Sequence, residues 1–169
     1  MDLRLERAGD HDAVRDLHRR AFGNAHGSTV AALVDDLRVD DPGALSLVAV
    51  EAGEVAGHVL FSRSLLDAPR RLVPVQVLSP LAVAPERQHQ GIGTALVRRG
   101  LRLLDERGVP LVFLEGDPRF YRRVGFRPGA PLGCRKPSLR IPDDAFQVQP
   151  LSAYEPWMTG TLVYSATFW

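Results

Sequence analysis

The chain has 169 residues, of which 45% are hydrophobic and 24% charged, and its formal net charge is +1. These values are typical of a single globular domain over residues 1–169, and the balance of charges gives no reason to expect a nucleic-acid or membrane partner. The single cysteine, Cys134, excludes an internal disulfide and a cysteine-based metal cluster, and the lack of an apolar leader or a run near ~18 apolar residues leads us to expect a cytoplasmic protein.

The first predicted elements are a strand and a helix. Hydrophobic and charged residues alternate over residues 2–6, which predicts a short strand. Asp10 is a suitable N-cap for a helix that begins near His11. The glycines and asparagine within residues 23–27 should end this helix, and Ser28 should cap a second one.

Extended segments and one long helix follow. Residues 45–67 are expected to form two strands joined by a hairpin turn at Ala52–Gly53, and residues 75–83 a further strand. Residues 91–107 form the longest predicted helix, because their apolar side chains recur at helical spacing. Gly108 fits its C-terminal stop.

Shorter elements complete the chain. We expect a strand at 109–114, a short helix at 118–124 and a long loop at 128–143, a segment rich in Pro, Gly and Arg. Two last strands are expected at 146–151 and 161–168. The alternation of strands and helices along the chain predicts one mixed α/β domain.

The turn between the strand at 75–83 and the long helix is a candidate phosphate site. The first N–H groups of a helix lack partners, and the helix dipole places partial positive charge there. Gly91 and Gly93 let a phosphate approach the backbone closely, because no Cβ stands in the way. The alternative is that these glycines only allow a tight strand-to-helix turn.

The same turn resembles a family signature, Q/R-x-x-G-x-G/A, that is typical of the GNAT superfamily of N-acetyltransferases. Its residues here are Gln88, His89, Gln90, Gly91, Ile92, Gly93 and Thr94. The resemblance implies a mixed, mostly antiparallel sheet of about seven strands flanked by about four helices, with acetyl-CoA as co-substrate and no metal. It implies that the turn holds the pyrophosphate, and that Leu81, Ala82 and Val83 bind the pantetheine arm, with backbone groups of Leu81 and Val83. His89 departs from the small residue common in the family, so its side chain should point outward or contact a phosphate.

A second motif follows the next strand. The run 116–126 resembles the family feature of a Tyr four residues before Gly-Phe, and it is similar to a branch of small bacterial YhbS-like acetyltransferases. The resemblance implies that Tyr121 is the general acid that protonates the leaving sulfur, whereas the alternative is a core tyrosine on a short helix. Asp117 occupies a position that contacts cofactor in the family, although Asp before Pro118 is also an ordinary N-cap.

Together these motifs predict an N-acetyltransferase that moves the acetyl group of acetyl-CoA to a primary amine of a small molecule or peptide by direct attack. The alternative is a non-catalytic acyl-CoA-binding or sensor protein on the same fold. A homodimer would be compatible with the family. The acceptor-binding segments, which we expect within residues 22–38 and 128–160, carry no motif that assigns a role to any side chain.

The general base is not identified by the motifs. Val77 and Ser79 occupy the strand positions where some family members place a His or Glu, and neither side chain can act as a base. Glu51, His58 and Glu115 remain as candidates. Deprotonating a lysine-like amine at pH 7 costs ~4.6 kcal/mol, so the missing base favours an acceptor of lower pKa, such as an α-amino group near ~7.8.

Two further groups of polar residues have simple interpretations. We interpret His11, His18 and His26 in the N-terminal helices as solvated histidines rather than metal ligands, because no third ligand is indicated. The arginines within residues 119–123 either attract the 3′-phosphate of the cofactor or form a solvated helix face.

Overall fold

The computed structural model describes residues 1–169 with the exception of the Asn24 side chain. The chain forms two compact units, which we describe separately: the first unit is residues 1–62 and 79–100, and the second unit is residues 63–78 and 101–169. Strands β3 (Glu54–Asp67) and β4 (Leu72–Val83) and helix α3 (Ile92–Glu106) each contribute residues to both units. In the described part of the chain, no helix has the length and hydropathy needed to cross a bilayer. The single domain expected from the sequence stays a prediction.

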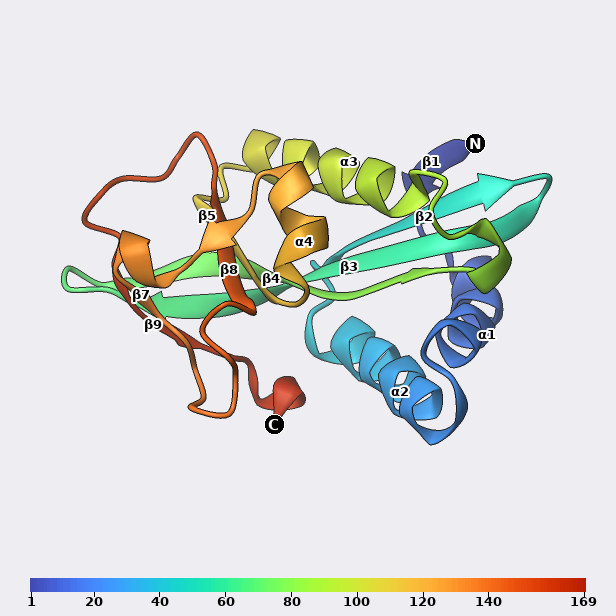
Figure 1. Ribbon diagram of the computed structural model, residues 1–169, viewed down its shortest axis with the longest axis horizontal. Coiled ribbons are helices and arrows are strands. Elements are labelled where there is room, and N and C mark those ends of the chain that lie inside the picture. Colours follow the sequence, from blue (N-terminus) through green and yellow to red (C-terminus); the bar gives the residue numbers. More distant parts are fainter. The chain divides into compact units, whose positions relative to one another are not determined.

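The first unit places helices on both faces of its strands (Figure 1). Strand β1 (Asp2–Leu5) pairs antiparallel with β2 (Leu45–Glu51), which pairs with β3 across the turn at Ala52–Gly53. The predicted first strand and hairpin are therefore confirmed. The helices on one face are α1 (His11–Phe22) and α2 (Asn24–Asp40), and the residues of α3 that belong to this unit lie on the other face. The unit also contains two 3-10 turns, η1 (Ala8–Asp10) and η2 (Pro85–Arg87).

Helix α2 begins earlier than the sequence pattern indicated. It runs from Asn24 without interruption at Gly27, so Ser28 lies inside the helix and does not cap it. A Cβ on Gly27 would lie 2.6 Å from the carbonyl oxygen of Arg19, so only glycine lets α2 approach the backbone of α1 this closely. The predicted end of the first helix is confirmed at Gly23, which follows Phe22 with φ 71. The helix-breaking role predicted for Gly27 and the cap predicted at Ser28 were wrong, because Gly27 serves helix packing.

The second unit is built on a mixed sheet. Its strand order is β3-β4-β5-β8-β6, and β9 pairs with both β3 and β7. Strand β5 (Leu111–Glu115) lies parallel to β4 and antiparallel to β8 (Phe146–Pro150). The remaining elements are β6 (Arg127–Pro128), β7 (Cys134–Arg135), β9 (Gly160–Val163), α4 (Pro118–Tyr121), η3 (Arg122–Val124), η4 (Ala130–Leu132) and η5 (Ala166–Phe168).

Across the described chain the strand pairs are antiparallel except β4–β5 and β7–β9, and the α-helices are α1 to α4. The predicted fold class, a mixed α/β fold with a mostly antiparallel sheet and about four helices, is confirmed.

The C-terminal predictions needed two corrections. The expected long loop at 128–143 contains β7, which pairs with β9 over two residues. The expected strand at 161–168 ends at Val163, and η5 follows it. A Cβ on Gly160 would lie 1.9 Å from the carbonyl oxygen of Asp67, so the β9 strand depends on a contact that is distant in sequence and carries no local pattern.

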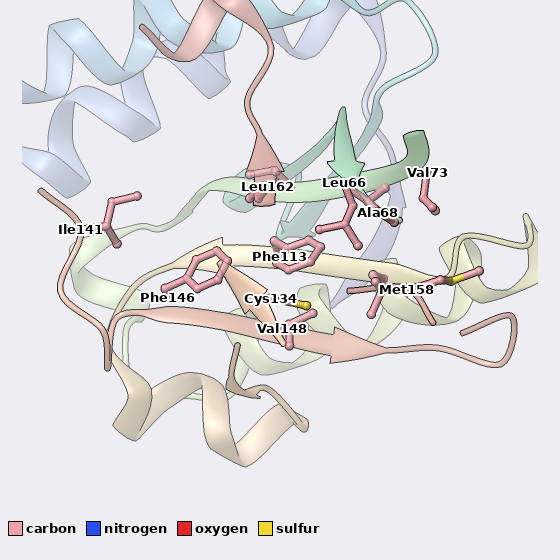
Figure 2. Close-up of a cluster of buried hydrophobic side chains, with 13 residues drawn as sticks. Leu66, Ala68, Val73, Phe113, Cys134, Ile141, Phe146, Val148, Met158 and Leu162 are labelled. Atoms are coloured by element: carbon pink, nitrogen blue, oxygen red, sulfur yellow. The ribbon is translucent and has the colours of Figure 1, made fainter. Parts of the chain in front are cut away.

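A buried apolar cluster organises the second unit (Figure 2). The rings of Phe113 and Phe146 stack with centroids 5.7 Å apart and an interplanar angle of 15°. Leu66, Val148 and Leu162 surround them and are each 0–1% exposed. Phe113 and Phe146 belong to β5 and β8, so the cluster fixes where β5 ends and therefore where the following segment begins.

Two glycines bring α3 close to β3 in the first unit. A Cβ on Gly57 of β3 would lie 2.8 Å from Ile92 Cγ2 and 2.9 Å from Leu96 Cδ1, both on α3. A Cβ on Gly100 of α3 would lie 2.2 Å from the ring of Phe61, which is fully buried. The contact determines the position of the N-terminal end of α3, because the helix can sit this close to the strand only without these side chains.

Gly100→Ala should therefore destabilise the protein by about 1–3 kcal/mol through overpacking, although alanine gains about 1 kcal/mol of helix propensity over glycine. The free energy of unfolding, measured by chemical denaturation, checks this. Gly9→Ala is the matched control, because a Cβ there meets nothing within 4 Å. A Gly100→Ala protein as stable as the wild type would contradict the packing role of this glycine.

Candidate functional site

The turn between β4 and α3 presents backbone N–H groups. The N–H of Ala95 donates to the carbonyl of Gly91 at 3.0 Å, so the N–H groups of Ile92, Gly93 and Thr94 precede the first helical bond. Gly91 has φ 85 and His89 has φ 63. Gln90, between these two residues, does not have a left-handed backbone. This alternation points successive N–H groups into one concavity, which is the geometry of an anion nest.

The His89 side chain is exposed, as expected for an outward-pointing residue. Its left-handed backbone costs roughly 1–2 kcal/mol relative to the right-handed form, since a Cβ crowds the next carbonyl there. Backbone strain of this size persists only where the surrounding structure imposes it, and it is concentrated at functional sites.

Two glutamine side chains hold the turn in place. Gln88 Nε2 donates to the carbonyl oxygen of Val83 at 3.2 Å, and Gln90 Nε2 donates to the carbonyl oxygen of Glu86 at 3.3 Å. Both amides therefore bond to the backbone of their own turn. Sequence reasoning assigned these residues to cofactor binding and missed this internal role, for which the spacing of two glutamines gives no signal.

At the end of β4, every second residue points its backbone N–H and C=O groups away from β3. The N–H of Ala84 donates to the carbonyl of Ala56 at 2.8 Å, so the groups of Ala84 point toward β3. Backbone polar groups alternate along an extended strand, so those of Val83 and Leu81 point the opposite way. This is the edge that a strand-like ligand arm would need for backbone hydrogen bonds.

In the second unit, α4 places Tyr121 against a glycine. The Asp117 carboxylate accepts from the N–H of Arg119 at 2.9 Å, which confirms the predicted N-cap. A Cβ on Gly116 would lie 2.6 Å from Tyr121 Cε2, so the absent side chain makes room for the ring. Phe120 and Phe126 contact the ring edge-on, at centroid distances of 4.9 and 5.7 Å.

Burial raises the pKa of Tyr121 to about 12. The phenol is consequently protonated at neutral pH and available as a hydrogen-bond donor. A raised pKa also makes complete proton transfer less favourable, so hydrogen-bond donation to a developing anion is the easier of the two functions.

The arginines near α4 are solvated. Arg119, Arg122 and Arg123 are all exposed, and Arg119 pairs with Asp117 at 3.1 Å. A hydrogen bond from this guanidinium lowers the pKa of the Asp117 carboxyl. The arrangement is that of a solvated helix face; a contact with a 3′-phosphate stays a prediction.

The three candidate bases have different surroundings. Glu51 pairs with Arg87 at 2.8 Å, and His58 is fully buried with both ring nitrogens in hydrogen bonds. Glu115 is exposed and makes no ion pair in the part of the chain that is described. Glu115 is therefore the only one of the three with an accessible and unpaired carboxylate.

A buried chain of hydrogen bonds runs through the first unit. Ser46 Oγ donates to Glu6 Oε2 at 2.6 Å and so must accept from His58 Nε2–H at 2.8 Å. His58 Nδ1 is then an acceptor for His18 Nε2–H, also at 2.8 Å. Glu6 in turn forms a hydrogen-bonded ion pair with Arg38.

The chain leaves His18 Nδ1 unprotonated, buried and without a hydrogen-bond partner among the described residues. The expectation that His18 is solvated was wrong, because the ring packs flat on Phe22 and edge-on to His58. Burial, and secondarily the charge of Arg38, lowers the pKa of His18 to about 4. Burial also lowers the pKa of His58 well below its usual value. No group of three or more potential metal ligands lies together in the described residues.

Comparison with known proteins identifies the family. A family model described as an acetyltransferase (GNAT) domain matches residues 2–129. The chain belongs to the GNAT acetyltransferase family. This match confirms the family predicted from the turn at residues 88–94 and from the Tyr121 motif. As a member of this family, the chain is an N-acetyltransferase.

Several relatives cover nearly the whole chain. The present chain is 34% identical over 155 residues to the uncharacterised N-acetyltransferase YjhQ of Escherichia coli. The match covers 89% of this chain and 84% of that protein. The crystal structure of the acetyltransferase YhbS from Escherichia coli in complex with CoA is 34% identical, with a TM-score of 0.86 over 99% of this chain and 91% of that one. A GNAT acetyltransferase from Brucella melitensis in complex with acetyl-CoA is 32% identical, with a TM-score of 0.78 over 99% and 97%.

The two buried histidines lead us to expect that the protein loses stability in acid. The folded-state pKa of His18 lies below the unfolded value of about 6.5, so stability is full above pH 6.5 and falls as the pH drops toward 4. The difference between the unfolded and folded pKa values of His18 corresponds to a loss of folding free energy on the order of 3 kcal/mol. Urea denaturation at several pH values measures it. His18→Gln, which cannot be charged, should show a smaller loss, and an identical pH dependence in both proteins would contradict the assignment.

Proposed function

We propose that the protein transfers the acetyl group of acetyl-CoA to a primary amine of a small molecule or peptide. One observation carries the proposal: a left-handed turn at Gly91 presents the N–H groups of Ile92, Gly93 and Thr94 in a chain of this family. The complexes of two relatives with CoA and acetyl-CoA support the same cofactor here.

The cofactor is assigned to two segments of the first unit. The pyrophosphate would accept hydrogen bonds from the turn at residues 88–94, where backbone donors and the helix dipole favour an anion. The pantetheine arm would bond to the backbone of Leu81 and Val83, past Ala82. A carbonyl oxygen has two lone pairs, so Val83 can accept from pantetheine and from Gln88 together. We assign Asp117 to capping α4 rather than to the cofactor, because its carboxylate already accepts from Arg119.

The chemistry follows from a neutral amine attacking the thioester carbonyl. The nitrogen forms the amide bond, the C–S bond breaks, the amine proton is released, and CoA leaves as a thiolate that is then protonated. Tyr121 would donate its phenolic hydrogen bond to the developing thiolate, which its raised pKa permits at neutral pH. The protein then supplies positioning of the amine, and stabilisation of the leaving group.

The amine must lose a proton before it attacks. An α-amino group with a reference pKa near 7.8 needs about 1 kcal/mol at pH 7, against ~4.6 kcal/mol for a lysine-like amine. Neither Val77 nor Ser79 on β4 can remove this proton, so we favour acceptors of the first kind. Finding that the most basic amines are the best acceptors would contradict this preference.

We also infer a cytoplasmic location. Cys134 is a free and buried thiol, and burial raises its pKa to about 11, so it stays in the unreactive protonated form. A reduced, isolated cysteine fits a reducing compartment. A homodimer remains compatible with the family.

Tyr121→Phe should lower kcat by about 10²-fold or more while leaving the KM for acetyl-CoA unchanged, because the phenol acts on the leaving group and not on ground-state binding. CoA release from acetyl-CoA across a panel of amines measures both constants. Tyr164→Phe, which also loses a tyrosine hydroxyl and lies outside the expected acceptor-binding segments, is the control. Unchanged turnover in Tyr121→Phe would remove this residue from the mechanism, and tight acetyl-CoA binding without turnover of any amine would favour a sensor instead.

A further inference from the structure

A cavity of about 760 Å³ lies in the second unit, and none of its lining residues has a role in the proposed chemistry. These residues come from three segments: 67–69 at the end of β3, 130–135 in η4 and β7, and 159–160 at the start of β9. A volume of this size is within the range of small-molecule binding sites.

Two glycines hold the three segments together. A Cβ on Gly160 would overlap the carbonyl oxygen of Asp67, and the N–H of Gly160 donates to the carbonyl oxygen of Gly133 at 3.0 Å. A Cβ on Gly133 would lie 2.9 Å from Thr159 Cγ2. Both glycines have a positive φ, 133 at Gly160 and 75 at Gly133, which other residues rarely adopt. The walls of the cavity are therefore fixed relative to one another by backbone contacts.

A row of three polar side chains crosses the strands at this cavity. Asp67 of β3 is in register with Thr161 of β9, and Thr161 is in register with Arg135 of β7. Residues in register place their side chains on the same face of a sheet. Leu66 and Leu162, next to Asp67 and Thr161 in sequence, belong to the buried cluster of Figure 2. Since side chains alternate along a strand, the polar row lies on the opposite, exposed face.

The acid and the base of this row are close but unpaired. Arg135 Nε donates to Thr161 Oγ1 at 3.1 Å, which holds the guanidinium beside the middle strand. Asp67 belongs to the next strand, ~4.8 Å further along the sheet. In the described part of the chain neither Asp67 nor Arg135 forms an ion pair, and they are the only charged residues that line the cavity. The cavity thus presents one negative and one positive group, both open to a ligand.

We propose that this cavity binds a small zwitterion, such as a free α-amino acid. Its ammonium group would donate to the Asp67 carboxylate, and its carboxylate would accept from the N–H groups of Arg135 that do not contact Thr161. Pro69 and Ala130 offer apolar surface to the rest of the molecule. A simple cation would be repelled by Arg135 and a simple anion by Asp67, whereas a zwitterion pairs with both. This binding goes beyond acetyl transfer and does not depend on it.

Three probes with related carbon skeletons test the proposal on the full chain without acetyl-CoA, so that no amine is consumed. L-leucine is the zwitterion, 4-methylpentanoate is leucine without its ammonium, and 3-methylbutylamine is leucine without its carboxylate. Ligand-observed NMR or calorimetry gives the dissociation constants. We expect L-leucine to bind the wild type roughly fivefold more tightly than either of the other two.

Variants of the two charged residues test each contact separately. Asp67→Asn should weaken L-leucine roughly fivefold and remove its advantage over 4-methylpentanoate, because the ammonium loses its partner. Arg135→Gln should remove its advantage over 3-methylbutylamine. Arg135→Lys should recover part of that advantage, because lysine keeps the charge but not the planar fork of donors.

Matched controls separate this site from general effects of charge. Asp36→Asn and Arg102→Gln remove exposed charges from α2 and α3, outside the cavity, and should leave the affinities of all three probes unchanged. The urea unfolding transition of each variant shows that it is folded.

Three results would overturn the zwitterion site. The first is equal affinity of L-leucine for the wild type, Asp67→Asn and Arg135→Gln, which would place any binding elsewhere. The second is a loss in Asp36→Asn or Arg102→Gln as large as that in the cavity variants. The third is no binding of L-leucine to the wild type at millimolar concentration, or no preference for it over the two singly charged probes.

Discussion

The close approach of α3 to β3 is the constraint on which the turn before α3 depends. Gly57 and Gly100 have no side chains of their own, so Ile92 and Leu96 pack against the backbone at Gly57, and Phe61 packs against the backbone at Gly100. The first turn of α3 is part of this packed surface, and its N–H groups are therefore held rather than mobile. Anion binding by backbone dipoles needs such rigidity, because donors already oriented toward the ligand require no reorganisation when it binds.

A second packing arrangement positions Tyr121. The rings of Phe113 and Phe146 stack within the buried cluster and join β5 to β8 (Figure 2). This packing fixes the end of β5 at Glu115, so Gly116 follows at a defined place. Gly116 admits the ring of Tyr121, and Asp117 caps the helix that carries it. A hydrophobic cluster thereby positions a hydrogen-bond donor and a carboxylate that are separated by few residues in sequence.

The features predicted from sequence were those with local signals. The hairpin at Ala52–Gly53, the turn at Gly91 and the cap at Asp117 each depend on residues within one turn, and all three are found. Long-range contacts carried no such signal: Gly27 was mistaken for a helix break, and His18 for a solvated residue, because their partners are on other elements. The family resemblance anticipated the fold, but the unpaired state of Glu115 could be seen only once its neighbours were placed.

The most direct test of the central claim, that the turn before α3 holds acetyl-CoA, compares two glycines. Gly91 has φ 85 and Gly108 has φ 77, and a Cβ on either would meet nothing within 4 Å. Alanine at either position should cost roughly 1–2 kcal/mol of stability through backbone strain alone. The dissociation constant of acetyl-CoA should rise about tenfold in Gly91→Ala, which distorts the nest, and remain at the wild-type value in Gly108→Ala. Equal acetyl-CoA affinity in the two variants would contradict the account.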